Sequence, residues 1–274
     1  SKTFHPGTIH AKKALQNLSL NLNDGDFVTV IGGNGAGKST MLNAVAGVWP
    51  VDCGKIIIDG VDVTRLSEHQ RAAYIGRVFQ DPMTSLDPTM TIGKQIMEGM
   101  LWHFKMPKAE AYQKALKLLE EVGITDAEKR MKSYPHQLSG GMRQRVVIAI
   151  ALSCDPDLLI CDEPTTALDV TIQAKILELI RSIQKERGIS VIYITHDLGV
   201  VAKVADYVDV MYAGKIVETG TIDEIFYDPR HPYTWGLLSA MPDLDTADER
   251  LYTIPGSPPN LLHEKPGDAF APRN

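Results

Sequence analysis

Glycines, a lysine and hydroxyl residues occur together in the segment GGNGAGKST at residues 32–40. The run FVTVI at 27–31 predicts a buried strand before it, and the residues after Lys38 have helical spacing. Here glycines let backbone N–H groups converge on phosphate oxygens, while lysine reaches the β and γ phosphates and serine ligates magnesium. The flanking strand and helix disfavour the alternative, an ordinary glycine-rich turn. We predict a phosphate loop that binds a nucleoside triphosphate and Mg²⁺, with these residues: Gly32, Asn34, Gly35, Gly37, Lys38, Ser39 (also a metal ligand) and Thr40.

Two adjacent acids end another apolar run, LLICDE at residues 158–163. Asp162, at the end of a buried strand, can complete a magnesium site, and Glu163 can activate the water that attacks a phosphate. Acids at a strand end can instead be solvated edge residues. Together with Lys38 they indicate phosphoryl transfer, because that reaction needs mainly positioning and charge neutralisation.

The segment LSGGMRQR at 138–145 places a hydroxyl and two glycines, Ser139, Gly140 and Gly141, at the start of a predicted helix. A helix N-terminus with a hydroxyl and exposed backbone N–H groups attracts an anion, so this segment predicts a second anion site.

A histidine and a glutamine near predicted strand ends are weaker signals. His196 ends SVIYITH, which places it at the carboxyl edge of the sheet, where ligands bind in open α/β folds. A single histidine is more often a surface or core residue, and Gln80 in VFQDP is equally uninformative alone.

Strands and helices alternate along the chain, which predicts an α/β fold with a mainly parallel sheet. Apolar residues recur at helical spacing over 107–122 and 171–187. The runs KIIID at 55–59 and SVIYIT at 190–195 predict further strands, and VDVMYAGKIVETG at 208–220 predicts a hairpin.

The composition bounds the class of protein. The chain has 274 residues, of which 44% are hydrophobic, which is ample for a buried core. A net charge of -6 argues against a general nucleic-acid binder. The three cysteines form no C-x-x-C pair, so neither zinc nor a disulfide framework is indicated, and the tail GDAFAPRN has no cysteine for an iron-sulfur cluster. No apolar run approaches the ~20 residues of a membrane span, and we expect a cytoplasmic protein.

The chain resembles the ATP-binding subunit of an ABC transporter in motifs that follow one another in order and at compatible spacings. The resemblance covers nearly the whole chain, and LSGG followed by an apolar strand ending in DEP is highly specific. It implies a P-loop NTPase fold with a mainly parallel core sheet, an antiparallel β subdomain and a helical subdomain, and an ATPase that uses ATP and Mg²⁺. The motifs are GGNGAGKST, Gln80, LSGGMRQR, LLICDEP, the ALD of 167–169, and His196.

The resemblance also implies roles for single residues. Gln80 would sense magnesium as a ligand and contact the membrane subunit, His196 would act on the γ-phosphate, and Phe4 would stack on adenine. Lys38 and Glu163 would carry the catalytic roles given above.

The resemblance implies that the second anion site serves a neighbouring subunit. Ser139, Gly140 and Gly141 would contact the γ-phosphate held by the phosphate loop of a second ATPase subunit, and Asp169 would act across the same dimer. Two chains would then enclose two ATP molecules, and hydrolysis would loosen the dimer and drive a membrane partner.

Within the family, residues 78–274 resemble the oligopeptide and dipeptide importers, most specifically in DPRHPYTWGLLSAMP and IPGSPPNL. Residues 1–80 look closer to ATPases of importers for amino acids or similar small solutes. We therefore consider a chimera joined within 79–87, with uneven divergence as the alternative.

This resemblance predicts four parts: residues 1–87 and 153–226 as the nucleotide-binding core, 88–152 as the helical subdomain with the signature, and 227–274 as a C-terminal extension. We expect an identical or different ATPase partner, transmembrane permease subunits, an indirect solute-binding protein, no nucleic acid, and a place on the inner face of the cell membrane. Two alternatives are an ABC ATPase that acts on DNA or ribosomes, and a hybrid that binds nucleotide without driving transport. ABC ATPases that act on chromosomes separate the phosphate loop from the signature by very long coiled coils, and the short spacing between the two motifs in this chain disfavours that class.

Overall fold

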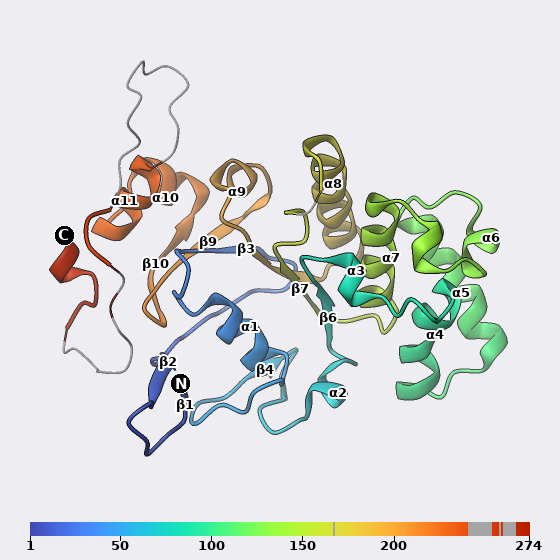
Figure 1. The fold of residues 1–274 in the computed structure, drawn as a ribbon, viewed down its shortest axis with the longest axis horizontal. Coiled ribbons are helices and arrows are strands. Elements are labelled where there is room, and N and C mark those ends of the chain that lie inside the picture. Colours follow the sequence, from blue (N-terminus) through green and yellow to red (C-terminus); the bar gives the residue numbers. More distant parts are fainter. Residues whose placement is uncertain (167, 241–253, 258, 260–266) are drawn as a thin grey trace. The chain divides into compact units, whose positions relative to one another are not determined.

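The computed structural model describes residues 1–166, 168–240, 254–257, 259 and 267–274, and the chain folds into two compact units (Figure 1). The first unit comprises Ser1–Leu22, Asp26–Ile56 and Ile194–Asn274, and the second comprises Asn23–Gly25 and Ile57–Tyr193. None of the helices in the described ranges is both long and apolar enough to cross a membrane.

The first unit contains both parallel and antiparallel strand pairs. Strand β3 pairs parallel with β9, and β9 pairs antiparallel with β10 across Ala213 and Gly214. Both turn residues have positive φ, 51° and 78°, as a two-residue hairpin turn requires, and the predicted hairpin is confirmed. The elements of the first unit are β1 (Lys2–Phe4), β2 (Lys12–Leu15), β3 (Phe27–Ile31), α1 (Lys38–Val45), α9 (Leu198–Val204), β9 (Tyr207–Tyr212), β10 (Lys215–Thr221), α10 (Ile222–Tyr227), α11 (Pro232–Ser239) and the 3₁₀ helix η2 (Ala271–Arg273).

The second unit joins further sheet strands to a group of helices. Strands β6 and β7 are parallel, with Val78 opposite Cys161, and the order on this side of the sheet is β8-β7-β6. The elements of the second unit are β4 (Ile57–Ile58), β5 (Val61–Asp62), α2 (Glu68–Arg71), β6 (Ile75–Val78), α3 (Pro82–Ser85), α4 (Ile92–His103), α5 (Lys108–Glu121), α6 (Ala127–Met131), η1 (Pro135–Gln137), α7 (Gly140–Leu152), β7 (Leu158–Asp162), α8 (Val170–Arg187) and β8 (Ser190–Ile194). The last residue of β8 belongs to the first unit.

The predicted α/β fold class is confirmed, including the small antiparallel sheets and the helical subdomain. Helices α5 and α8 begin and end within about two residues of their predicted ends. The prediction of a strand over KIIID at 55–59 is wrong in extent, because only Ile57 and Ile58 pair, with β5. Asp59 and Gly60 have φ of 44° and 72° and form a tight turn, which ends the strand early.

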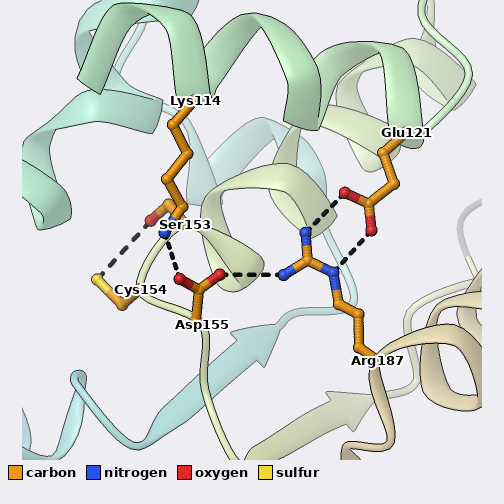
Figure 2. Close-up of polar contacts among 6 residues, drawn as sticks. All are labelled: Lys114, Glu121, Ser153, Cys154, Asp155 and Arg187. Atoms are coloured by element: carbon orange, nitrogen blue, oxygen red, sulfur yellow. Dashed lines mark hydrogen bonds and ion pairs between the residues drawn. The ribbon is translucent and has the colours of Figure 1, made fainter. Parts of the chain in front are cut away.

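An ion-pair network ties helix α5 to the ends of α7 and α8 (Figure 2). Arg187 donates to both carboxylate oxygens of Glu121, at 2.7 and 2.6 Å, and to Asp155 at 3.2 Å. Asp155 also pairs with Lys114. The Glu121 hydrogen bond is the main reason that the pKa of Arg187 lies above its usual value. A paired, two-pronged contact of this kind fixes the orientation of both side chains.

We expect Arg187→Met to lower the free energy of unfolding by about 1 kcal/mol, because it breaks two partly buried ion pairs at once. Arg230→Met is the matched control, since the Arg230 side chain is 81% exposed and forms its ion pair with Asp228, two residues away in the chain. Thermal unfolding of both variants measures the difference. Equal melting temperatures for the two variants would contradict the assigned importance of the network.

Candidate functional site

The glycines at 32–37 are required by the backbone of the loop itself. Strand β3 is buried along its whole length and delivers the chain to Gly32, whose φ is 150°. A Cβ on Gly32 would lie 2.2 Å from the carbonyl oxygen of Met211, so no other residue fits there. Gly35 and Gly37 have φ of 80° and 108°, and Gly37 immediately precedes helix α1. The loop thus leads directly into the N-terminus of helix α1, and a glycine loop followed by a helix N-terminus is an arrangement that binds phosphate.

Lys38 lies folded back over this loop. Its Nζ donates to the carbonyl oxygens of Gly32 at 2.6 Å and Gly33 at 3.2 Å. The N–H of Gly214, in the hairpin turn, donates to Ala36 at 2.7 Å and fixes the far side of the loop. Asn34, Gly35 and Ser39 are exposed. The Lys38 ammonium group and the exposed residues of the loop therefore lie within one short segment of the chain.

We expect Gly32→Ala to destabilise the protein by about 2–4 kcal/mol, because the new methyl group meets backbone atoms that have no room to move. Gly54→Ala is the control, since Gly54 also has positive φ, 98°, yet nothing lies within 4 Å of its Cβ position. Chemical denaturation followed by circular dichroism compares the two. A Gly32→Ala variant as stable as Gly54→Ala would show that the loop has another conformation.

Two other predicted residues of the first unit lie on separate elements. His196 is exposed between the end of β8 and the start of α9, where Asp197 caps the helix by accepting from the N–H groups of Gly199 and Val200. Phe4 lies in β1, with its ring edge-on to Trp49 at 4.9 Å and with Lys2 Nζ 5.5 Å from the ring centroid.

The second unit brings together two acids and a glutamine at the carboxyl ends of neighbouring strands. Asp162 ends β7, and Glu163 follows it with a φ of 47°, a left-handed backbone that is uncommon for glutamate. Gln80 Nε2 donates to Glu163 Oε2 at 3.4 Å, although the two residues are 83 positions apart in the chain. Such backbone strain is found preferentially at functional sites.

Two residues around this pair were missed by sequence reasoning. Thr166 donates its hydroxyl to Glu163 Oε2 at 3.3 Å, and its position three residues after Glu163 was the available signal. Arg77 lies on β6, with its guanidinium 4.6 Å from the ring centroid of Phe79. Burial lowers the pKa of Arg77, while the charges of Glu68 and Asp162 raise it. Only the folded sheet brings Arg77 near the charge of Asp162.

The signature segment begins helix α7 as predicted. Ser139 is the N-cap, accepting from Met142 N–H at 3.4 Å, and Gly140 and Gly141 form the first turn. A Cβ on Gly141 would lie 2.9 Å from Ile172, so this glycine lets α7 approach α8 closely. Helix α8 has its own N-cap, Asp169, which accepts from Ile172 N–H at 3.0 Å. Two capped helix starts therefore lie close together, carrying Ser139 and Asp169.

A buried glutamine links the signature helix to the loop that holds Gln80. Gln144 is fully buried and donates to the carbonyl oxygen of Phe79 at 3.3 Å. This contact was not predicted, because a glutamine in LSGGMRQR has no distinctive spacing. It gives the second unit a direct connection between its helical part and its acidic strand ends.

Two family models match the chain. One describes the ABC transporter family and matches residues 15–166; the other describes the oligopeptide/dipeptide transporter C-terminal region and matches residues 217–273. The oligopeptide transport ATP-binding protein OppD of Bacillus subtilis is 54% identical over 96% of this chain and 76% of its own length. The dipeptide transport ATP-binding protein DppD of Lactococcus lactis is 52% identical over 96% of this chain and 78% of its own length.

Solved structures agree with the fold. The ATP-binding cassette MJ0796, a dimer bound to ADP and Pi, matches with a TM-score of 0.70 and 30% identity over 81% of this chain and 95% of its own. CbiO1 of Clostridium perfringens, part of the transporter complex cbiONQ, matches with a TM-score of 0.72 and 31% identity over 82% and 88%.

The comparisons give no evidence of a chimera. The similarity to single relatives extends across the suspected junction at 79–87 and covers 96% of the chain. The structure adds close packing between the parts before and after it: a Cβ on Gly76 would lie 2.4 Å from the carbonyl oxygen of Ala151. The chimera hypothesis is therefore not supported, and the chain matches single relatives along nearly its whole length.

Proposed function

The chain belongs to the ABC transporter family, in its oligopeptide/dipeptide branch, and on that premise we propose that it is the ATP-hydrolysing subunit of a peptide importer. The observation that carries the ATPase assignment is the Gln80–Glu163 hydrogen bond at the end of neighbouring strands. It joins one of the residues that we propose to hold magnesium to the residue that we propose to orient the attacking water. The peptide assignment is supported by the match of residues 217–273 to the C-terminal region of peptide transporters.

Nucleotide binding is assigned to the phosphate loop. Backbone N–H groups of the loop and the start of α1 would hold the phosphates, with Lys38 neutralising the charge of the β and γ groups. The loop geometry fits this role, because positive φ at three glycines turns the backbone inward. The proposed set also includes Asn34 and Thr40 of the loop. Phe4 would stack on adenine, and His196 would act on the γ-phosphate.

Magnesium would be held by oxygen ligands from Ser39, Asp162 and Gln80. These are hard oxygen donors of the type that Mg²⁺ prefers, and in nucleotide sites it is usually held by one or two carboxylates, here Asp162, together with the phosphates. When bound, it neutralises charge on the transferred phosphoryl group.

The chemical step itself is assigned to Glu163. Its carboxylate, held by Gln80 and Thr166, would accept a hydrogen bond from water and orient that water for attack on the γ-phosphate. The φ of 47° at this residue sets the direction in which its side chain leaves the end of strand β7.

The exposed start of α7 would act on a second subunit. Ser139, Gly140 and Gly141 would contact the γ-phosphate of ATP held by that subunit, and Asp169 would lie across the same dimer. The dimeric state of MJ0796 supports this arrangement. ATP would then join two ATPase subunits, identical or different, at the inner face of the cell membrane. The remaining partners would be permease subunits and, indirectly, a peptide-binding protein.

The test is peptide-stimulated ATP hydrolysis after reconstitution with permease subunits and binding protein of an oligopeptide transporter in lipid vesicles. We expect an oligopeptide to raise the hydrolysis rate severalfold over the same vesicles with single amino acids. Hydrolysis that responds to amino acids and not to peptides would contradict the peptide assignment. A hydrolysis rate that does not change when the membrane subunits are added would favour an ABC ATPase with no role in transport.

A further inference from the structure

A tyrosine from the C-terminal extension contacts the phosphate loop directly. The N–H of Gly33 donates to the Oη of Tyr233, on helix α11, at 2.7 Å. Tyr233 is only 3% exposed, so water cannot replace this hydroxyl easily. Both residues belong to the first compact unit, although they are 200 positions apart in the chain. The extension therefore supplies a hydrogen-bond partner that the loop itself lacks.

The contact acts on a single peptide group. The Gly33 N–H and the Gly32 carbonyl belong to the same planar peptide, so fixing the direction of one fixes the direction of the other. The Gly32 carbonyl accepts from Lys38 Nζ at 2.6 Å. The peptide is thus bonded on one side by Tyr233 and on the other by Lys38. Because glycines flank this peptide on both sides, their own conformational preferences restrain it little.

The tyrosine ring is held firmly by its surroundings. Its centroid lies 4.5 Å from that of Tyr212 and 5.3 Å from that of Phe270, within the apolar core of the first unit. Burial raises the pKa of Tyr233, so its hydroxyl stays protonated. A buried hydroxyl in an aromatic cluster is a rigid acceptor, which is the property needed to orient a flexible loop.

Helix α11 is anchored at its start by one carboxylate. Glu218, on strand β10, accepts from the N–H groups of Arg230 and His231 and from the hydroxyl of Thr234. His231 then caps the helix by accepting from Tyr233 N–H at 3.1 Å. The backbone of Tyr233 is therefore fixed to the same hairpin whose turn bonds Ala36 of the loop.

The shape of the loop matches the tyrosine. A Cβ on Gly33 would lie 3.2 Å from the Tyr233 hydroxyl, closer than an ordinary contact. Gly33 therefore leaves the space that the hydroxyl occupies.

We propose that Tyr233 is a positioning residue for ATP binding: its hydroxyl orients the Gly32–Gly33 peptide, whose carbonyl in turn holds the Lys38 ammonium at the loop. This inference deepens, and rests on, the proposed role of the phosphate loop. It gives the C-terminal extension a part in nucleotide binding, and it predicts that altering the extension changes the affinity for ATP.

The experiment compares Tyr233→Phe with Tyr212→Phe in the full chain. Each variant loses one hydroxyl from the same aromatic cluster, but the Tyr212 hydroxyl bonds to Arg273 rather than to the loop. We expect Tyr233→Phe to weaken MgATP binding about three- to tenfold in calorimetric titration, the worth of one hydrogen bond. We expect Tyr212→Phe to stay within about twofold of the unchanged chain.

A spectroscopic readout separates positioning from general destabilisation. The Gly33 amide proton resonance should shift in Tyr233→Phe and stay in place in Tyr212→Phe. If Tyr233→Phe does not fold, Gly33→Ala serves instead, because it retains Tyr233 and displaces its hydroxyl; the same weakening is expected.

The outcomes are distinct. Failure of the unchanged chain to bind MgATP would refute the proposed nucleotide site. Tight binding by the unchanged chain, with equal affinity and an unmoved Gly33 resonance in Tyr233→Phe, would overturn the inference alone. Equal weakening by both tyrosine variants would also overturn it, because the effect would then come from the cluster.

Discussion

Replacing Lys38 by alanine is expected to weaken MgATP binding and to reduce ATP hydrolysis by on the order of a hundredfold or more. The substitution removes the only side-chain ammonium group within the segment 32–40, and charge-assisted contacts to phosphate are among the strongest polar contacts available. It also removes the Nζ that bonds the Gly32 and Gly33 carbonyls. Titration calorimetry and phosphate release measure the two effects.

Lys55→Ala is the control for this prediction. Lys55 is an exposed lysine of the same unit, so its loss changes the net charge equally without touching the loop. A Lys38→Ala variant that binds MgATP as tightly as Lys55→Ala would refute the assignment of the loop.

Replacing Glu163 by glutamine is expected to reduce hydrolysis by on the order of a hundredfold or more while ATP binding is retained. The substitution keeps the size of the side chain and its ability to accept from Gln80, but removes the charge that orients water. Phosphate release measured at saturating MgATP tests this. Glu178→Gln, on the exposed face of α8, is the matched control. Equal activity of the two variants would place the catalytic carboxylate elsewhere.

Local patterns were sufficient to predict the main elements around the phosphate. Strand 27–31 and the start of α1 agree with the structure, because a buried apolar run, a glycine loop and a helix are all encoded over a few neighbouring residues. The helix ends at Val45, and Gly47 adopts a φ of 84° shortly after it. Boundaries of this kind depend on one backbone angle.

Contacts between distant segments could not be predicted from the residues alone. Glu163 was identified from the acids that end an apolar run and Gln80 through resemblance, but their hydrogen bond depends on β6 and β7 being neighbours in the sheet. The Tyr233–Gly33 contact had no sequence signal, because a tyrosine in HPYTW is an ordinary helix residue until α11 packs on the hairpin. The left-handed backbone of Glu163 is likewise a product of the fold.

The most direct test of the central claim is the solution mass of Glu163→Gln with and without MgATP, measured by light scattering. The chain has a mass of 30.1 kDa, and blocked hydrolysis should let ATP-joined dimers accumulate. We predict twice the monomer mass with MgATP and the monomer mass without it, reversed by Ser139→Arg, which adds bulk and charge at the start of α7. A protein that binds MgATP and stays monomeric even when mixed with candidate partner ATPase subunits would contradict the account.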